Sequence, residues 1–218
     1  MERIPGFMAR AYNKAARMAR GSYYSQVADE IVSELGSGMA LDLGTGPGYL
    51  PIEIVKRAPA IKVEGIDLTA ELVKIAQENS VRAGVGDRVN FEVMNAAKLR
   101  FNDNSYDMVF STGMLHGLRS PDKVIKVLKE CYRVLKPGGE LWIYDPAKVC
   151  SGIDTKAWKA SLTPRERFLY KLFAFYELFN PPHYYSQEEI TQIITDTDFE
   201  SYGVEEKDKE IKVKLRKL

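Results

Sequence analysis

The sequence predicts an α/β protein whose parallel sheet is covered by helices on both faces. Strand-like and helix-like segments alternate between residues 37 and 148, and such alternation is typical of a parallel sheet. Within it, residues 41–48 (LDLGTGPG) lead an apolar strand through three glycines into a helical pattern. A turn of this kind presents backbone to a ligand. The ligand is therefore expected beyond the carboxyl ends of the strands.

The segments after the glycine turn continue the alternation in order. Helical patterns are expected at 49–57, from the Thr69 cap to Gly84, and from the Ser120 cap through Leu135, and strands at 61–66, 89–93, 107–110 and 140–145. Pro137-Gly138-Gly139 is expected to separate the third of these helices from the strand that follows it. Phe199–Glu205 and Lys209–Lys217 are two further strand candidates.

Asp67 ends the second strand, about 20 residues after the glycine turn, where a carboxylate accepts hydrogen bonds from both ribose hydroxyls of a nucleotide-like ligand. The alternative is that Asp67 is a cap or turn residue for the next helix. Thr69 is the better cap candidate because Glu71 falls in the first turn after it. The ribose role is therefore favoured.

A dinucleotide site is the first alternative for the glycine turn. Its fingerprint needs a glycine where this chain has Tyr49, and a bulky ring there opposes close packing of helix and strand. The pattern therefore argues against a NAD-dependent oxidoreductase.

The spacing D-x-G-x-G-x-G at residues 42–48 resembles motif I of the class I S-adenosylmethionine-dependent methyltransferases. Three further segments extend the resemblance: GIDLT at 65–69, NAAKLRFNDNSYDMVFSTGMLHGL at 95–118, and LKPGGELWI at 135–143. Together they resemble the small-molecule group that includes the ubiquinone/menaquinone methyltransferases. This resemblance implies a Rossmann-like, seven-stranded, mostly parallel sheet with an antiparallel final hairpin. It also implies S-adenosylmethionine as the cofactor and S-adenosylhomocysteine as its product.

The resemblance further implies a set of cofactor-binding residues at successive strand ends. They are Asp42, Gly44, Thr45, Gly46, Gly48 and Tyr49 around the glycine turn, then Asp67, Leu68, Asn95, Ala96, Ser111, Thr112 and Gly113, with Tyr24 from the N-terminal helices. Tyr12 and Tyr23 are alternatives for covering the cofactor, and plain helix packing is a further alternative for all three tyrosines. Relatives usually have an acid where this chain has Asn95. Its amide oxygen still accepts a hydrogen bond from adenine, at a loss of about 1 kcal/mol.

The two histidines are the candidates for a catalytic group. His116 follows the fourth strand, at the edge where the transferred methyl group is expected, and His183 stands beside Tyr184 and Tyr185. His116 is interpreted as a general base, a hydrogen-bond donor to the substrate, or a residue touching the cofactor. A structural role is the alternative for both histidines.

The chain is expected to form one domain over residues 1–218. Its parts are N-terminal covering helices (1–36), a cofactor-binding core (37–148), a helical lid insertion (149–185), and the last helix with the final hairpin (186–218). In the lid, Thr163-Pro164-Arg165-Glu166 predicts a capped helix that is apolar around most of its circumference. Its cover is expected to be a hydrophobic substrate, a partner in a homodimer, or the core.

Asn180-Pro181-Pro182-His183 resembles a motif of amino methyltransferases acting on nucleic acids, but that motif follows the fourth strand. Here it is interpreted as the end of the lid helix, before a second capping box at Ser186–Glu189.

Charge and composition favour a small, near-neutral substrate. Thirty-one basic residues against 30 acidic ones give a net charge of +1, so no nucleic-acid partner is expected. Cys131 and Cys150 have no ligand or disulfide spacing, and no metal is expected. No membrane span or signal peptide is expected, so the protein is predicted to be cytoplasmic; its basic N-terminus leaves a mitochondrial transit segment as the lesser alternative.

The leading hypothesis is an S-adenosylmethionine-dependent methyltransferase that moves a methyl group by in-line displacement to an oxygen, nitrogen or carbon atom of a small organic molecule. One alternative is an RNA or protein methyltransferase. Another is a non-catalytic module that binds the adenosyl cofactor.

Overall fold

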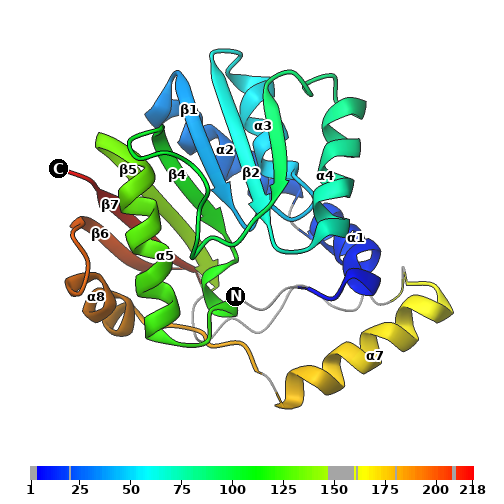
Figure 1. Ribbon diagram of the computed structural model, residues 1–218. Coiled ribbons are helices and arrows are strands. Elements are labelled where there is room, and N and C mark those ends of the chain that lie inside the picture. The colour runs from blue at the N-terminus through cyan, green and yellow to red at the C-terminus, as the bar shows by residue number, and fades with distance from the viewer. Residues whose placement is uncertain (1–3, 20, 147–159, 161, 180, 208–209) are drawn as a thin grey trace.

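The computed structural model describes residues 4–19, 21–146, 160, 162–179, 181–207 and 210–218. Its strands form one seven-stranded sheet in the order β3-β2-β1-β4-β5-β7-β6 (Figure 1). They are β1 (Gly38–Leu43), β2 (Ile61–Asp67), β3 (Val89–Val93), β4 (Tyr106–Thr112), β5 (Leu135–Pro146), β6 (Glu200–Lys207) and β7 (Glu210–Arg216). The first five pair in parallel, whereas β7 is antiparallel to β5 and β6. The predicted parallel core and antiparallel final hairpin are confirmed.

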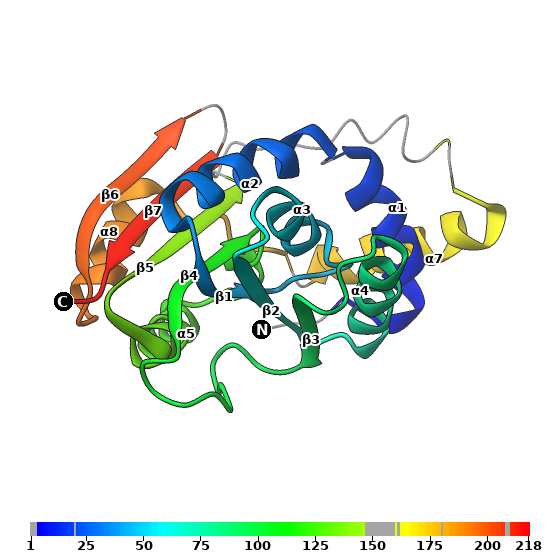
Figure 2. The same cartoon turned by 90° about the horizontal axis from the view of Figure 1, so that it is seen from above.

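Helices cover both faces of this sheet, as predicted. They are η1 (Gly6–Met8), α1 (Ala9–Ala19), α2 (Gly21–Leu35), α3 (Tyr49–Arg57), α4 (Ala70–Arg82), η2 (Leu115–Gly117), α5 (Pro121–Val134), α7 (Pro164–Phe179) and α8 (Gln187–Thr195). Figure 2 shows α5 and α8 on one side of the sheet and α2 and α3 on the other. Strand side chains alternate between the faces, so each face has its own buried apolar cluster.

The two clusters show how the alternation is used in β4. Val109 points into the cluster that α5 and α8 complete with Leu128 and Ile194. Its neighbour Phe110 belongs to the cluster of the opposite face, where α2 contributes Ile31. All of these side chains are buried, and β4 is the central strand of the sheet.

The segment Pro137-Gly138-Gly139, which was expected to separate the helix from the strand, lies inside β5. Leu135 pairs with Tyr106, and a register shift then follows before Met108 pairs with Glu140. The Gly138 N–H donates to the Lys217 carbonyl at 2.8 Å, with Gly138 at a φ of 80°. The prediction that these residues separate the helix from the strand is wrong, because β5 begins at Leu135, directly after α5, and the glycines form an irregularity inside it that stays bonded to the C-terminal segment.

Helix α7 begins at the predicted capping box. The Thr163 hydroxyl accepts from the Glu166 N–H at 3.3 Å, and Glu166 Oε2 accepts from the Thr163 N–H at 2.8 Å. Leu169 and Tyr170 pack against a small cluster of Met8, Ala11 and Leu162. The second cover that the sequence predicts for this helix is not supplied by the described residues, since four large apolar side chains are exposed: Phe168, Leu172, Phe175 and Leu178.

Parts of the predicted lid, residues 149–159, 161 and 180, lie outside the described residues, and Cys150 is among them. Cys131 is described and is buried in α5. No described helix combines the length and hydropathy needed to cross a membrane.

Candidate functional site

The glycine turn joins β1 to α3 at the carboxyl edge of the sheet. Gly44, Gly46 and Gly48 have φ values of 71°, 54° and 76°, a region that L side chains enter only with strain. The N–H groups of Gly44 and Thr45 both donate to the Ile66 carbonyl, at 2.8 and 2.9 Å. A Cβ atom on Gly48 would lie 2.8 Å from the ring of Phe91. The turn is therefore fixed by its own backbone and by close packing below it.

Asp67 is bonded directly to this turn. Its Oδ2 accepts from the Gly46 N–H at 3.1 Å, and its Oδ1 accepts from the Thr69 N–H at 2.8 Å. Burial holds the pKa of Asp67 above its ordinary value. The hydrogen bonds from these N–H donors offset part of that rise. The turn role, which was the alternative reading of Asp67, is thus present in the structure. It leaves lone pairs on both oxygens, because each carboxylate oxygen accepts about two hydrogen bonds.

Asp42 and Thr45 place unpaired polar atoms beside the same turn. Among the described residues, Asp42 Oδ1 and Thr45 Oγ1 are buried without a hydrogen-bond partner. The pKa of Asp42 is raised to about 7, chiefly by burial; the Thr45 side chain lowers it in part, and the negative charge of Asp67 adds to the rise. Buried polar atoms are rarely left unpaired, so each such atom is a sign of a missing ligand or water.

Helix α1 covers the outer side of the glycine turn. A Cβ atom on Gly46 would meet the ring of Tyr12 at 3.5 Å and no side chain closer than that. The Tyr49 hydroxyl donates to Asn13 Oδ1 at 2.8 Å, and the Tyr24 ring lies 6.5 Å from that of Tyr49. In contrast, the Tyr23 hydroxyl donates to Glu210 on β7. Tyr12, Tyr24 and Tyr49 are therefore near the turn, whereas the Tyr23 hydroxyl is directed to the hairpin.

The site as described fits S-adenosylmethionine. Gly46 leaves room for a ligand to approach the backbone of the turn. Asp42 and Asp67 supply carboxylate oxygens, which suit the ammonium group and the ribose hydroxyls of that cofactor. The aromatic rings of Tyr12, Tyr24 and Tyr49 form an apolar side to the same region.

The expected adenine contacts lie after β2 and β3. Asn95 is exposed, and its Oδ1 accepts from the Ala97 N–H at 2.9 Å. Ala96 is fully buried, and Leu68 is half-buried. The Asn95 amide oxygen thus shapes its own loop and retains one lone pair for a ligand.

The end of β4 is tied to both neighbouring strands. The Ser111 hydroxyl donates to the Leu43 carbonyl at 2.9 Å, so this side chain bonds to β1. The Gly113 N–H donates to the Tyr144 carbonyl at 2.8 Å, and Thr112 is buried. A Cβ atom on Gly44 would lie 3.1 Å from Met114. The segment after β4 therefore packs directly on the glycine turn.

His116 is held by a buried carboxylate at the end of β5. Its Nδ1 lies 2.9 Å from Asp145 Oδ1. The same carboxylate accepts from the backbone N–H groups of Leu115 at 2.6 Å and His116 at 3.1 Å. The Asp145 side chain is 4% exposed, whereas that of His116 is 26% exposed. Asp145 therefore fixes the orientation of a histidine that remains accessible.

The segment before α8 completes this side of the site. The His183 N–H donates to the His116 carbonyl at 2.9 Å, and the rings of His116 and Tyr184 stack with centroids 5.6 Å apart. The ring centroids of His183 and Tyr185 are 4.3 Å apart. The His183 Nε2 atom lies 3.4 Å from Glu189 Oε1. The backbone of His183 thus reaches the site, while its ring is engaged with Tyr185 and Glu189.

Asp145 is the functional candidate that the sequence analysis missed. It was noted only as the end of the fifth strand. The available signal was an acid at the carboxyl end of an otherwise apolar strand, next to the strand that leads to His116. No group of three metal-ligating side chains occurs among the residues that the structure describes.

Comparison with known proteins agrees with this architecture. Residues 40–139 match the family model described as a methyltransferase domain. The chain is 34% identical over 110 residues to the ubiquinone/menaquinone biosynthesis C-methyltransferase UbiE of Geotalea daltonii, across 50% of this chain and 46% of that protein. It is 36% identical over 137 residues to the demethylmenaquinone methyltransferase of Lactiplantibacillus plantarum, across 62% and 56% of the two chains. The chain thus spans about half the length of these curated relatives.

A solved structure extends the likeness to nearly the whole chain. The crystal structure of a SAM-dependent methyltransferase from Aquifex aeolicus matches with a TM-score of 0.67 and 24% identity. The match covers 94% of this chain and 98% of that one. This likeness supports the fold.

Proposed function

We propose that the chain is a class I S-adenosylmethionine-dependent methyltransferase and that it transfers a methyl group to a carbon atom of a small organic acceptor. The observation that carries the proposal is the hydrogen bond from the Gly46 N–H to Asp67, which joins the two sequence signals of a cofactor site. The name of the UbiE relative, a ubiquinone/menaquinone biosynthesis C-methyltransferase, supports a carbon acceptor.

The chain's own residues hold the cofactor in this proposal. Asp67 accepts from the ribose hydroxyls with its remaining lone pairs, and the Asp42 carboxylate accepts from the ammonium group. The open backbone at Gly46 permits close approach, and Tyr12 covers it. Asn95, Ala96 and Leu68 surround the adenine, while Thr112 ends β4 and Gly113 follows it. Bound S-adenosylmethionine supplies an activated methyl group on its sulfonium, so alignment of the acceptor contributes most of the acceleration.

His116 supplies the base that a carbon acceptor needs. A ring carbon that gains a methyl group must lose its hydrogen as a proton. The hydrogen bond of His116 Nδ1 to Asp145 favours the tautomer with the proton on Nδ1, which makes Nε2 the acceptor nitrogen. Asp145 also stabilises the imidazolium that forms when Nε2 takes the proton. His183 is not needed in this step, because its ring is directed to Glu189 and Tyr185.

Isothermal titration of the purified chain with S-adenosylmethionine and S-adenosylhomocysteine, with NAD as control, tests the cofactor assignment. We expect binding of the adenosyl pair alone. Asp67→Ala should weaken that binding about 10- to 100-fold, because a charged acceptor is lost. Asp87→Ala, at an exposed surface aspartate, is the matched control and should bind as the wild type does.

The same titration separates the alternatives. Binding of NAD alone would refute the cofactor assignment. Binding of the adenosyl pair without methyl transfer to any of a panel of phenols, hydroquinones and 1,3-dicarbonyl compounds would refute the carbon-acceptor proposal. Transfer to RNA or protein instead would assign the chain to the larger-substrate alternative.

A further inference from the structure

Helix α7 presents a row of large apolar side chains to solvent. Phe168 is 62% exposed, Leu172 47%, Phe175 61% and Leu178 76%. They follow one another at spacings of four, three and three residues, which keeps them on one side of a helix. We refer to these four residues as the apolar stripe. Exposed apolar groups that gather in one place, rather than singly, mark an interaction surface.

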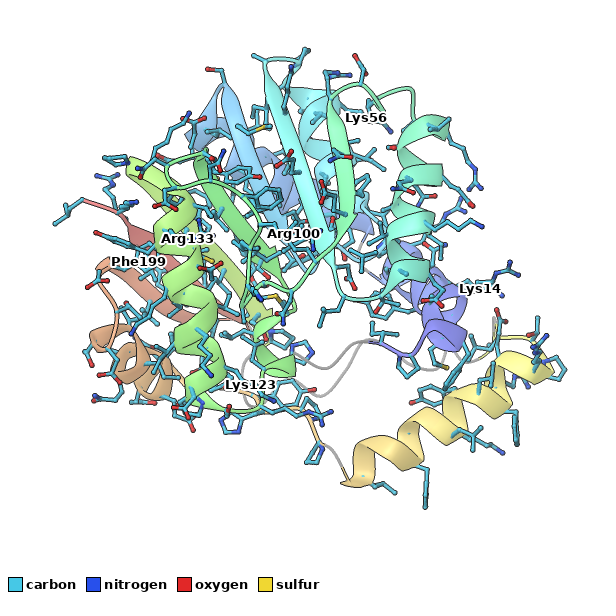
Figure 3. The ribbon with its side chains drawn as sticks, in the orientation of Figure 1. Lys14, Lys56, Arg100, Lys123, Arg133 and Phe199 are labelled. Carbon is cyan, nitrogen blue, oxygen red and sulfur yellow. The ribbon has the colours of Figure 1, made fainter. Side chains whose placement is uncertain are left out.

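The orientation of the apolar stripe is fixed by the opposite side of the helix. Leu169 and Tyr170 pack on the cluster of Met8, Ala11 and Leu162. At the N-terminal end of α7, Lys14 of α1 lies 2.8 Å from Glu166; Figure 3 shows Lys14 on α1 beside that end of the helix. The body of the protein therefore holds one side of α7 and leaves the apolar stripe facing away from it.

Basic residues flank the apolar stripe. Arg165 and Lys171 are both exposed. With about 100° of rotation per residue, they lie about 60° from Phe168 on either side of it. The Arg167 side chain is also exposed and reaches back to the Leu162 carbonyl. Glu166, in contrast, is engaged with Lys14 and Thr163. Arg165 thus borders the apolar stripe on the side of Leu172, and Lys171 lies on the other side, between the directions of Phe175 and Leu178.

We propose that the apolar stripe, together with Arg165 and Lys171, binds the surface of an anionic lipid bilayer. Helices that lie in a membrane interface combine an apolar face with flanking Lys and Arg residues. The apolar groups enter the acyl boundary, while the long basic side chains extend to the phosphate level. No membrane-crossing helix is required for this mode of binding.

The flanking charges favour a lipid surface over a second copy of the chain. Pairing of two copies about a two-fold axis would place the same basic border on both partners. Like charges would then face each other, which opposes association. The negatively charged headgroups of an anionic bilayer would instead attract both Arg165 and Lys171.

The position of α7 gives this binding a consequence. Figure 1 shows α7 beyond the carboxyl ends of the parallel strands, the edge that holds the glycine turn. Binding through the apolar stripe would bring that edge to the lipid surface. If the methyltransferase proposal holds, its acceptor is then an apolar molecule carried in the membrane. Membrane binding itself does not depend on that proposal.

Vesicle co-sedimentation of the whole chain tests the inference without any measurement of methyl transfer. The probes are phosphatidylcholine vesicles with and without about 30% phosphatidylglycerol. We expect binding to the anionic vesicles, and release when ionic strength rises from about 0.1 M to 1 M and the Debye length falls from about 10 Å to 3 Å. Phe168→Ser/Leu178→Ser should weaken binding by at least about tenfold, as should Arg165→Glu/Lys171→Glu.

Matched variants keep the test specific. Val81→Ser replaces an apolar side chain that is 74% exposed on α4, and Lys126→Glu/Lys129→Glu reverses two exposed charges on α5; both should bind as the wild type does. Circular dichroism checks that every variant is folded. Failure of the wild-type protein to co-sediment with anionic vesicles would overturn the inference. So would apolar-stripe variants that bind unchanged, or that only convert a wild-type dimer into a monomer.

Discussion

The glycine turn and helix α7 lie at the same edge of the molecule but are built in opposite ways. The turn is buried and held by backbone hydrogen bonds, with Gly48 packed so closely on Phe91 that no side chain fits. Helix α7 rests on a few residues of η1 and α1 and exposes Phe168 and Leu178. The conformation of the glycine turn is fixed by many contacts with the rest of the fold, whereas α7 contacts the rest of the protein along one side only.

This difference separates two tasks. A cofactor common to a whole family can be held mainly by backbone atoms, so its site follows from the fold and tolerates little change. An acceptor or a surface partner is met by side chains on a peripheral helix, where substitutions leave the fold intact. Changes in the turn should therefore abolish function outright, whereas changes in α7 should alter what the protein binds.

The largest expected effect on function is that of Gly46→Val, because a protein that does not bind the cofactor transfers no methyl group. The valine side chain would fill the space beneath Tyr12, which is where the cofactor is proposed to approach the backbone. Affinity for S-adenosylmethionine should fall by more than about 100-fold in isothermal titration, equivalent to about 2.7 kcal/mol. Gly36→Val is the control, because Gly36 also has a positive φ of 63° but has no heavy atom near its added Cβ. Equal affinity in the two folded variants would contradict the placement of the cofactor at the turn.

His116→Asn should have the next largest effect. Loss of a general base lowers kcat by about 10²- to 10⁴-fold, while cofactor affinity should stay unchanged. Asp145→Asn should also lower kcat, because an amide in its place favours the wrong histidine tautomer. His183→Asn is the matched control and should cost less than about tenfold. A loss of kcat at His183 that equals the loss at His116 would show that the two histidines were assigned incorrectly.

The sequence predicts the first region far better than the second. The glycine turn, Asp67 and the Thr69 cap depend on local spacing and on the rule that parallel strands end at one edge. Asp145 escaped notice because its partner, His116, is 29 residues away and their contact depends on β4 pairing with β5. The cover of α7 stayed open among a substrate, a partner and the core for a related reason. An apolar helix looks the same in sequence whether the chain covers it or leaves it open.

Asp42→Asn should change the pH dependence of stability in a direction fixed by the pKa of the native carboxyl. Burial raises this pKa from 3.8 to about 7, so the folded protein keeps a proton that the unfolded chain releases between those values. The free energy of unfolding of the wild type therefore falls by up to about 4 kcal/mol as pH rises from about 4 to 7. Asp42 causes no further loss above that range. The asparagine side chain of the variant cannot ionise, so the variant should gain stability relative to the wild type across this window.

Urea denaturation at pH 5 and pH 8 measures this difference, with Asp87→Asn as an exposed control. Cofactor affinity should favour the wild type, whereas stability favours the variant. The reason is that only ionised Asp42 attracts the ammonium group of the cofactor. The variant should thus bind S-adenosylmethionine more weakly than the wild type at pH 8. Parallel stability curves for wild type and variant would show that Asp42 keeps its ordinary pKa.

The smallest expected effect comes from the helix caps, and it tests the contrast between core and periphery directly. Thr163→Ala removes the hydroxyl that accepts from the Glu166 N–H in α7, and Ser186→Ala removes the corresponding acceptor for Glu189 in α8. Each loss costs its helix about 1 kcal/mol.

Because α8 buries Ile190, Ile193 and Ile194, Ser186→Ala should lower the free energy of global unfolding by that amount. Thr163→Ala should instead speed amide exchange in residues 164–168 and leave global unfolding unchanged, since α7 can open locally. An equal loss of global stability in both variants would place α7 within the cooperative core and would remove the reason for treating its exposed face as a separate binding surface.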